Sequence, residues 1–152
     1  MSRRNLILMA VLTLAFPCLA RADDPTRDDA KQILGRWRIV DGENQGKRET
    51  PERIKDTFVD VTPDQLSVTD RDEKKTWVTT YKLDPSKSPR SIVMTVTQGE
   101  WKGKTSYGIY RLEGDLLRIC YALPGQPAPA EFTTKPGSKQ LCFVMKRVAA
   151  AK

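Results

Sequence analysis

Short segments in which apolar and polar residues alternate run through the chain from residue 36 onward. Turn-forming residues interrupt them at intervals of roughly 8 to 12 positions, a spacing typical of sandwiches and barrels. We predict eight strands, at residues 36–41, 54–62, 65–69, 76–83, 91–97, 105–112, 116–123 and 139–147. No long helical segment separates them, which excludes an alternating strand–helix architecture and its nucleotide sites.

Eight antiparallel strands close naturally into an up-and-down barrel, because closure leaves no sheet edge exposed. A barrel of this size is either filled by side chains or wide enough for one small ligand. Before the first strand, Thr26 is a residue type that caps helices and Gly35 one that ends them. The expected fold is therefore all-β, an eight-stranded antiparallel barrel with a short N-terminal helix.

The first residues have the pattern of a secretory signal peptide. Arg3 and Arg4 precede an apolar run at residues 6–16, and Ala20-Arg21-Ala22 is a typical cleavage pattern. The run is shorter than the roughly 20 residues of a membrane-spanning helix, which makes a membrane anchor the less favoured alternative. The paired arginines also fit a twin-arginine export signal. We expect a signal peptide at residues 1–22, a barrel domain at 23–148 and a disordered tail at 149–152, with export to the periplasm or the medium.

The charge balance gives little support to a nucleic-acid partner. The chain has 26 basic and 19 acidic residues, a net charge of +7, and cleavage after Ala22 would remove three arginines and no acid. A net charge of about +4 remains, spread without a long basic block, which favours solubility over nucleic-acid binding. No other apolar segment is long enough to span a membrane.

Two cysteines, Cys120 and Cys142, would remain in the exported chain. An even pair in an exported protein predicts a disulfide. The alternative is two free thiols in adjacent strands. Each cysteine shares the parity of a charged residue, Arg118 or Lys146, so we expect an outward-facing bond across the last two strands.

The residue types needed for most catalytic and metal sites are missing. There is no histidine, so the usual general base and the commonest metal ligand are absent. No glycine-rich phosphate loop follows a strand. We therefore predict no catalytic residues, no metal and no cofactor. The remaining enzymatic alternative would use carboxylates in turns or loops, namely Asp84, Glu113, Asp115 and Glu131.

Aromatic side chains and methionine offer a possible pocket lining. The candidates are Trp77, Tyr81, Met94, Tyr107 and Tyr121. Such residues line apolar ligand pockets, and they also fill barrel cores, so both interpretations stay open. Trp101 stands in a turn with Gly99 and Gly103, where it would either contact a partner or plug the barrel. Glu131, beside Phe132, is a candidate for surface contact.

Gly35-x-Trp37 at the start of the first strand resembles the Gly-x-Trp signature of lipocalins. In that family an arginine at the end of the last strand packs over the tryptophan and closes the barrel floor. Arg147 stands at the matching position, and alternation places it on one face with Met145 and Phe143. The resemblance implies that Gly35, Trp37 and Arg147 form a structural floor.

A broader resemblance covers nearly the whole chain after the signal peptide, through residues 34–37, 81–90, 108–120, 129–132 and 146–147. In this order the segments are similar to a family of small exported lipocalin-like proteins, abundant in planctomycete bacteria and of uncharacterised function. That family usually has an arginine before Pro129, where this chain has Ala128. We expect a non-catalytic binding module for a small apolar molecule or a protein partner; the alternative is a structural domain with a filled core.

Overall fold

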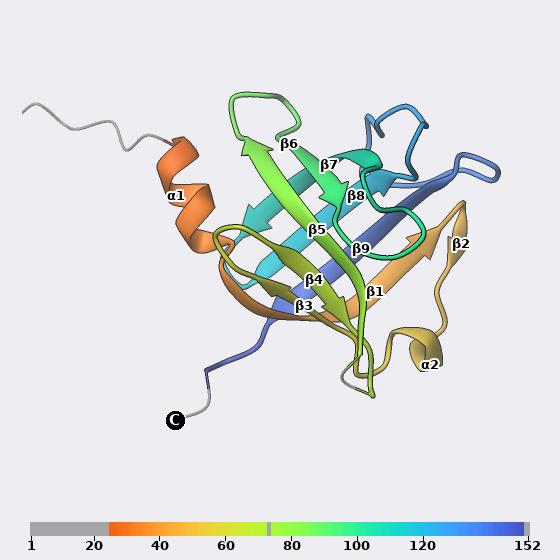
Figure 1. The fold of residues 1–152 in the computed structure, drawn as a ribbon, viewed down its shortest axis with the longest axis horizontal. Coiled ribbons are helices and arrows are strands. Elements are labelled where there is room, and N and C mark those ends of the chain that lie inside the picture. Colours follow the sequence, from red (N-terminus) through yellow and green to blue (C-terminus); the bar gives the residue numbers. More distant parts are fainter. Residues whose placement is uncertain (1–24, 73, 151–152) are drawn as a thin grey trace, which may run out of the picture.

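The computed structural model describes residues 25–72 and 74–150 (Figure 1). The expected signal peptide and the last two residues of the expected tail lie outside these residues. The elements are α1 (Pro25–Gln32), β1 (Gly35–Asn44), β2 (Lys47–Arg48), α2 (Pro51–Ile54), β3 (Phe58–Val61), β4 (Leu66–Thr69), β5 (Lys75–Asp84), β6 (Ser91–Val96), β7 (Thr105–Glu113), β8 (Leu116–Ala122) and β9 (Gln140–Arg147).

The strands form a closed antiparallel barrel, as the alternation predicts. From β1 the order runs through β3 and each later strand in turn to β9, which pairs back with β1. In the closing pair, Trp37 lies opposite Arg147 and Asn44 opposite Leu141. Eight strands make the barrel wall, and β2 is a two-residue extension that pairs only with the far end of β1. Within the described residues the fold is thus all-β and lipocalin-like in form, with only two short helices.

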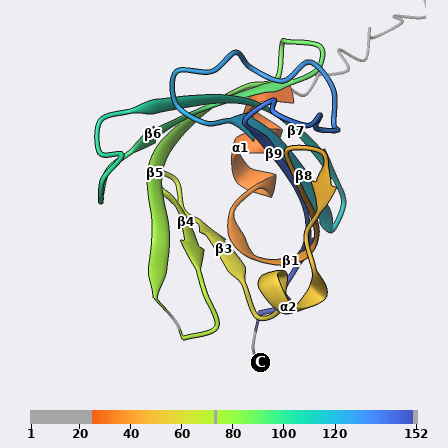
Figure 2. The ribbon, with the colours of Figure 1, turned by 90° about the vertical axis from the view of Figure 1, so that its right-hand side faces the viewer.

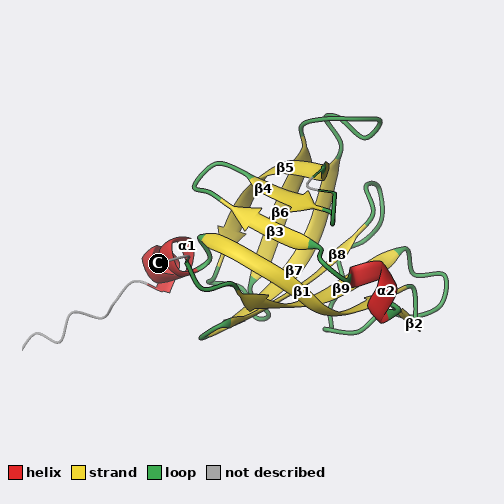
Figure 3. Ribbon diagram, turned by 90° about the horizontal axis from the view of Figure 1, so that it is seen from below, coloured by secondary structure: helices red, strands yellow, loops and turns green. Residues whose placement is uncertain are grey.

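The two helices lie at opposite ends of the barrel (Figures 2 and 3). The α1 end is where β1 begins and β9 ends. The α2 end carries the helix α2, the turns after β4 and β6, and the long loop at residues 123–139 between β8 and β9. Within the part of the chain that the structure describes, no helix has the length and apolar character needed to cross a membrane.

The chain from β1 to β3 differs from the expected strands at residues 36–41 and 54–62. Only Gln45 and Gly46 turn, both with positive φ (50° and 81°), which suits a two-residue hairpin loop. β1 therefore extends to Asn44. Pro51 then starts α2, where a proline costs no hydrogen bond, and β3 begins only at Phe58.

The buried core concentrates toward the α1 end. Trp37, Ile92 and Leu117 are fully buried there, and Ile33, just after α1, joins them. Gly35 turns the chain from α1 into β1 with a φ of +119°, a conformation that side chains rarely adopt. Although the sequence suggests that Gly35 ends the helix, α1 ends at Gln32, and Gly35 opens the strand.

Candidate functional site

A cavity of about 290 Å³ occupies the barrel interior toward the α2 end. Its wall is largely apolar and is contributed by inward-facing residues of most strands and by α2. The lining residues are Ile39, Glu49, Arg53, Ile54, Thr57, Val59, Leu66, Val68, Thr76, Trp77, Met94, Ile119, Tyr121, Phe143 and Met145. Because Arg53 and Thr76 are exposed to solvent, the cavity reaches the surface beside them. The volume lies near the lower limit of small-molecule sites.

Three aromatic side chains shape the cavity wall. The rings of Tyr121 and Phe143, from β8 and β9, are tilted against each other with centroids 6.4 Å apart. Burial raises the pKa of the Tyr121 hydroxyl to about 12, so the group is neutral at physiological pH. Trp77 faces them from β5, and its buried indole N–H finds no acceptor among the described residues. The wall is therefore mainly apolar, and the indole N–H of Trp77 is an unpaired donor buried behind it.

The rim of the cavity carries one ion pair. The Glu49 carboxylate, whose side chain is only 9% exposed, lies 3.1 Å from Nε of Arg53, which is 72% exposed. Arg53 belongs to α2 and Glu49 to the segment before it, so the helix that sequence reasoning missed supplies the charged rim. The alternation of inward and outward residues in β8 and β9 could have placed Ile119, Phe143 and Met145 in the wall. The residues of α2 follow no such periodic pattern, so the sequence could not have placed them there.

The predicted lining residues divide three ways. Trp77, Met94 and Tyr121 line the cavity. Tyr81 faces inward but packs on the core, and its hydroxyl donates to the Thr62 carbonyl oxygen at 2.8 Å. Tyr107 is wrong as a lining residue, because it is 50% exposed on the outer surface.

The error at Tyr107 has a simple cause in the alternation of β7. Ser106, Gly108 and Tyr110 are buried, whereas Tyr107 and Arg111 are exposed. Position 108 also faces the barrel interior, because a Cβ added to Gly108 would lie 3.0 Å from Cβ of the cavity-lining Tyr121. The shared parity of Tyr107 with Arg111 was the signal that places Tyr107 outside.

The α1 end is closed by Arg147 and Trp37. The guanidinium lies 4.1 Å from the indole centroid. It also donates to the carbonyl oxygens of Leu34, at 2.9 Å, and Gln32, at 2.5 Å. The indole N–H donates to the Ile33 carbonyl oxygen at 2.8 Å. The resemblance to lipocalins implied this floor, and the expected contact is present.

A buried carboxylate joins α1 to the barrel wall. Asp29 is 5% exposed and accepts from Nη1 of Arg90 at 3.0 and 2.9 Å and from the Tyr110 hydroxyl at 2.6 Å. Burial and this hydrogen bond raise the pKa of Tyr110 well above its usual range. The partners of Asp29 come from β7 and the loop before β6, which lie far from α1 in the sequence.

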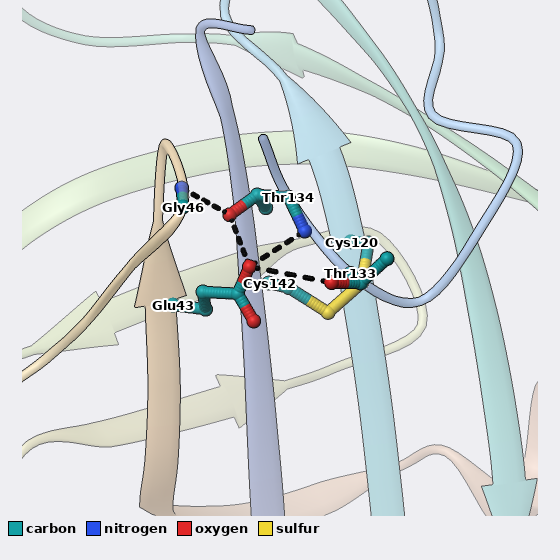
Figure 4. The surroundings of a disulfide bond; sticks show 6 residues. All are labelled: Glu43, Gly46, Cys120, Thr133, Thr134 and Cys142. Carbon is teal, nitrogen blue, oxygen red and sulfur yellow. Dashed lines mark hydrogen bonds between the residues drawn. A yellow bond between two sulfur atoms is a disulfide. The ribbon is translucent and has the colours of Figure 1, made fainter. Parts of the chain in front are cut away.

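Cys120 and Cys142 form a disulfide across β8 and β9, as predicted (Figure 4). The bond is on the outer side of the barrel, yet both cysteines are buried with Ile109, and Phe132 of loop 123–139 packs against them. The outward direction is thus correct. The loop folds back over the bond and removes it from solvent.

Glu43 fastens the same loop to β1 (Figure 4). Its carboxylate accepts from the hydroxyl and the backbone N–H of Thr134, at 2.6 and 2.7 Å. The Thr134 hydroxyl in turn accepts from the Gly46 N–H at 2.7 Å. The hydrogen bonds from Thr134 hold the pKa of Glu43 below its usual range.

The two predicted surface residues lie outside the cavity. Trp101 is 41% exposed in the turn between β6 and β7, which places it at the α2 end without plugging the barrel. Glu131 is exposed in loop 123–139 beside Phe132, whose ring packs under the Arg111 guanidinium at 4.7 Å.

The other carboxylates proposed for catalysis are engaged elsewhere. Asp84 accepts from the backbone N–H and hydroxyl of Ser86, and the hydroxyl contributes most to holding its pKa below the usual value. Asp115 pairs with Arg147 at 3.3 Å. Glu113 lies 3.9 Å from Arg111. Among the described residues, the cavity lining contains one carboxylate, Glu49, and no group of three or more potential metal ligands is found.

Comparisons with family models, with curated proteins and with solved structures found no match to this chain. The candidate site therefore rests on its own geometry, which is an apolar cavity inside a barrel, closed at the α1 end and rimmed by charge at the α2 end.

Proposed function

We propose that this protein is a non-catalytic binding module that holds one small, mainly apolar ligand inside the barrel. The observation that carries the proposal is the cavity of about 290 Å³ lined by Trp77, Met94, Tyr121 and Phe143. Transfer of an apolar ligand from water to such a wall is favourable by roughly 25 cal/mol per Å² of buried apolar surface.

The division of the barrel interior favours binding over a purely structural role. Toward the α1 end, Trp37, Ile92 and Leu117 pack without exposure. Toward the α2 end, the same barrel leaves room between Val68 and Met145. A domain that needs only a stable core gains nothing from this space, because a cavity in a core costs contacts and stability.

An enzyme that uses carboxylates has weaker support. General acid–base chemistry normally needs two groups within reach of one substrate. Of the described residues that line the cavity, Glu49 is the one carboxylate, and it is paired with Arg53. A protein partner at Trp101 is a second candidate, favoured by the exposure of that indole at the α2 end.

The sequence pattern of residues 1–22 leads us to propose export with cleavage before Asp23. We also propose membership of the planctomycete family of small exported lipocalin-like proteins, on the segments quoted above. The intact mass of protein recovered from the periplasm or medium tests the first point. A mass that retains the first 22 residues would contradict cleavage.

The ligand proposal is tested by native mass spectrometry of protein purified from its own host, followed by titration with 1-octanol. We expect a retained small molecule in the first experiment and saturable quenching of tryptophan fluorescence in the second. Val68→Phe narrows the cavity and should weaken octanol binding at least five-fold. Val40→Phe is the matched control, because Val40 is 42% exposed on the outer surface.

Two results would contradict the ligand proposal. One is the absence of any retained mass together with non-saturable octanol binding. The other is equal octanol affinity in Val68→Phe and the parent protein, provided that both melt as folded domains.

A further inference from the structure

The apolar cavity adjoins a second hollow at the α2 end, which is lined mainly by polar and charged residues. This second hollow has a volume of about 500 Å³. Its lining residues are Asn44, Gln45, Lys47, Arg48, Glu49, Thr50, Arg53, Pro136 and Gly137. Glu49 and Arg53 line both hollows, so the ion pair between them forms the boundary. Because they share this charged boundary, we treat the apolar cavity as the inner part and the second hollow as the outer part of one candidate site.

Positive charge prevails in the outer part. Among the described residues of its lining, Lys47, Arg48 and Arg53 are basic, and Glu49 is the one carboxylate. Arg48 is held by Asp41 outside this hollow, through bonds of 3.0 and 2.9 Å from its Nε and Nη2. Lys47 is exposed, and no carboxylate within the described residues pairs with it.

Arg53 is suited to bind a second acid. Its Nε faces Glu49 at 3.1 Å, while the side chain as a whole is 72% exposed. A guanidinium has five N–H donors in a planar fork and binds a further carboxylate without releasing the first. Lys47 and the outer side of Arg53 thus offer two cationic contacts beside the mouth of the apolar cavity.

We infer that the ligand is a small anionic amphiphile, a single short apolar tail with a carboxylate or similar acidic head. The inference rests on the proposed binding function. The tail occupies the cavity among Met94, Tyr121 and Phe143, and the head lies at the rim between Lys47 and Arg53. A volume of about 290 Å³ accommodates one short tail, which favours a free monomeric amphiphile over a lipid with two long chains.

The charges at the rim also argue against the opposite head group. A cationic head would lie beside Lys47, Arg48 and Arg53, and like charges at this range disfavour binding. Its possible partner, Glu49, is 9% exposed and already paired with Arg53. A neutral ligand fills the cavity but makes no use of the basic rim.

Octanoate, 1-octanol and octyltrimethylammonium share a tail and differ in the head, so they test the inference directly. Binding is followed by tryptophan fluorescence in the parent protein, Lys47→Ala, Arg53→Gln and the double variant. Arg53→Gln leaves an amide that still donates to Glu49, which protects the fold. Lys102→Ala is the control, because Lys102 is an exposed residue of the turn after β6 and lines neither hollow.

We expect each single variant to weaken octanoate binding about three-fold and the double variant about ten-fold, since partly exposed ion pairs contribute modestly. Octanol affinity should change much less, and added salt should weaken octanoate selectively. Lys102→Ala should bind all three ligands as the parent does.

The outcomes separate the two proposals. If octanol and octanoate both fail to bind the parent protein, the binding function itself is contradicted. If octanol binds, but octanoate keeps its affinity in the folded double variant, the anionic head is wrong and the binding function stands. Tighter binding of octyltrimethylammonium than of octanoate would likewise overturn the inference.

Discussion

Arg147 stacks on Trp37, with the guanidinium 4.1 Å from the ring centroid, and the two residues are directly opposed on β9 and β1. The same guanidinium donates to the carbonyl oxygens of Leu34 and Gln32 and lies 3.3 Å from Asp115. One side chain thus connects the two strands that close the barrel to the segment that follows α1.

Arg147→Ala should lower the melting temperature. A cation–π contact contributes about 0.5–2 kcal/mol, and the Leu34 and Gln32 carbonyl groups would also lose their donor. We expect a loss of about 2 kcal/mol in the free energy of unfolding, measured by chemical denaturation. The stability of Arg147→Lys should lie between those of the parent protein and Arg147→Ala, because lysine keeps the charge without the planar fork. An unchanged melting curve for the alanine variant would refute this role.

The disulfide predicts an intact mass 2 Da below that of the reduced protein. Reduction should cost about 3 kcal/mol of stability on the chain-entropy model, since the cysteines are 22 residues apart. Because Phe132 covers the pair, reduction of the native protein should require much more reductant than reduction in denaturant. Two thiols that alkylate without prior reduction would rule out the bond.

Asp29→Asn should destabilise the closed end. The substitution removes the negative partner of Arg90 and Tyr110, and hydrogen bonds to charged groups contribute about 1.5–3 kcal/mol. Spectroscopic titration gives an independent readout, because loss of the carboxylate should lower the pKa of Tyr110, although burial keeps it above the usual value. Asp28→Asn on the exposed side of α1 is the control. Equal stability of the two variants would contradict a special role for Asp29.

Loop 123–139 should loosen in acid. The pKa of Glu43 is lower in the folded protein than in the unfolded chain, so its stabilising effect is complete above the unfolded value of about 4.3 and is lost as the pH falls through the folded value. Hydrogen exchange of the Thr134 amide should therefore rise, relative to the exchange expected for an unfolded chain, below about pH 4.

Glu43→Gln should reproduce this loosening at neutral pH. Chymotrypsin should cleave faster after Phe132, whereas cleavage after Trp101, in the turn between β6 and β7, provides an internal reference. Glu131→Gln, in the same loop but exposed, is the matched control. If Glu43→Gln leaves the cleavage rate after Phe132 unchanged, the carboxylate does not fasten the loop.

Local sequence patterns were sufficient to predict much of the barrel. Alternation located β4 to β9 to within about two residues, and it oriented Met145 and Arg147 inward. The pairing of Cys120 with Cys142 followed from there being one possible partner. Side-chain direction in a strand has a period of two, so inspection of the sequence recovers it wherever the strand is regular.

The candidate site was harder to predict because its parts come from irregular segments. α2 is four residues long and buries none of them, so the sequence has no helical period of apolar residues from which to predict it. Glu49 and Arg53 nevertheless form the rim of the cavity. Tyr107 was misplaced for a related reason, since a list of aromatic residues ignores the face on which each one lies.

The alternating pattern and its turns were enough to predict an all-β barrel, because strand periodicity is a local property of the sequence and closure of eight strands leaves no free edge. Tertiary structure alone decided that this barrel is filled at the α1 end and hollow at the α2 end. The reason is that a void depends on how inward side chains from Val68 to Met145 meet in space, and their summed volumes and directions are not a local property of the sequence.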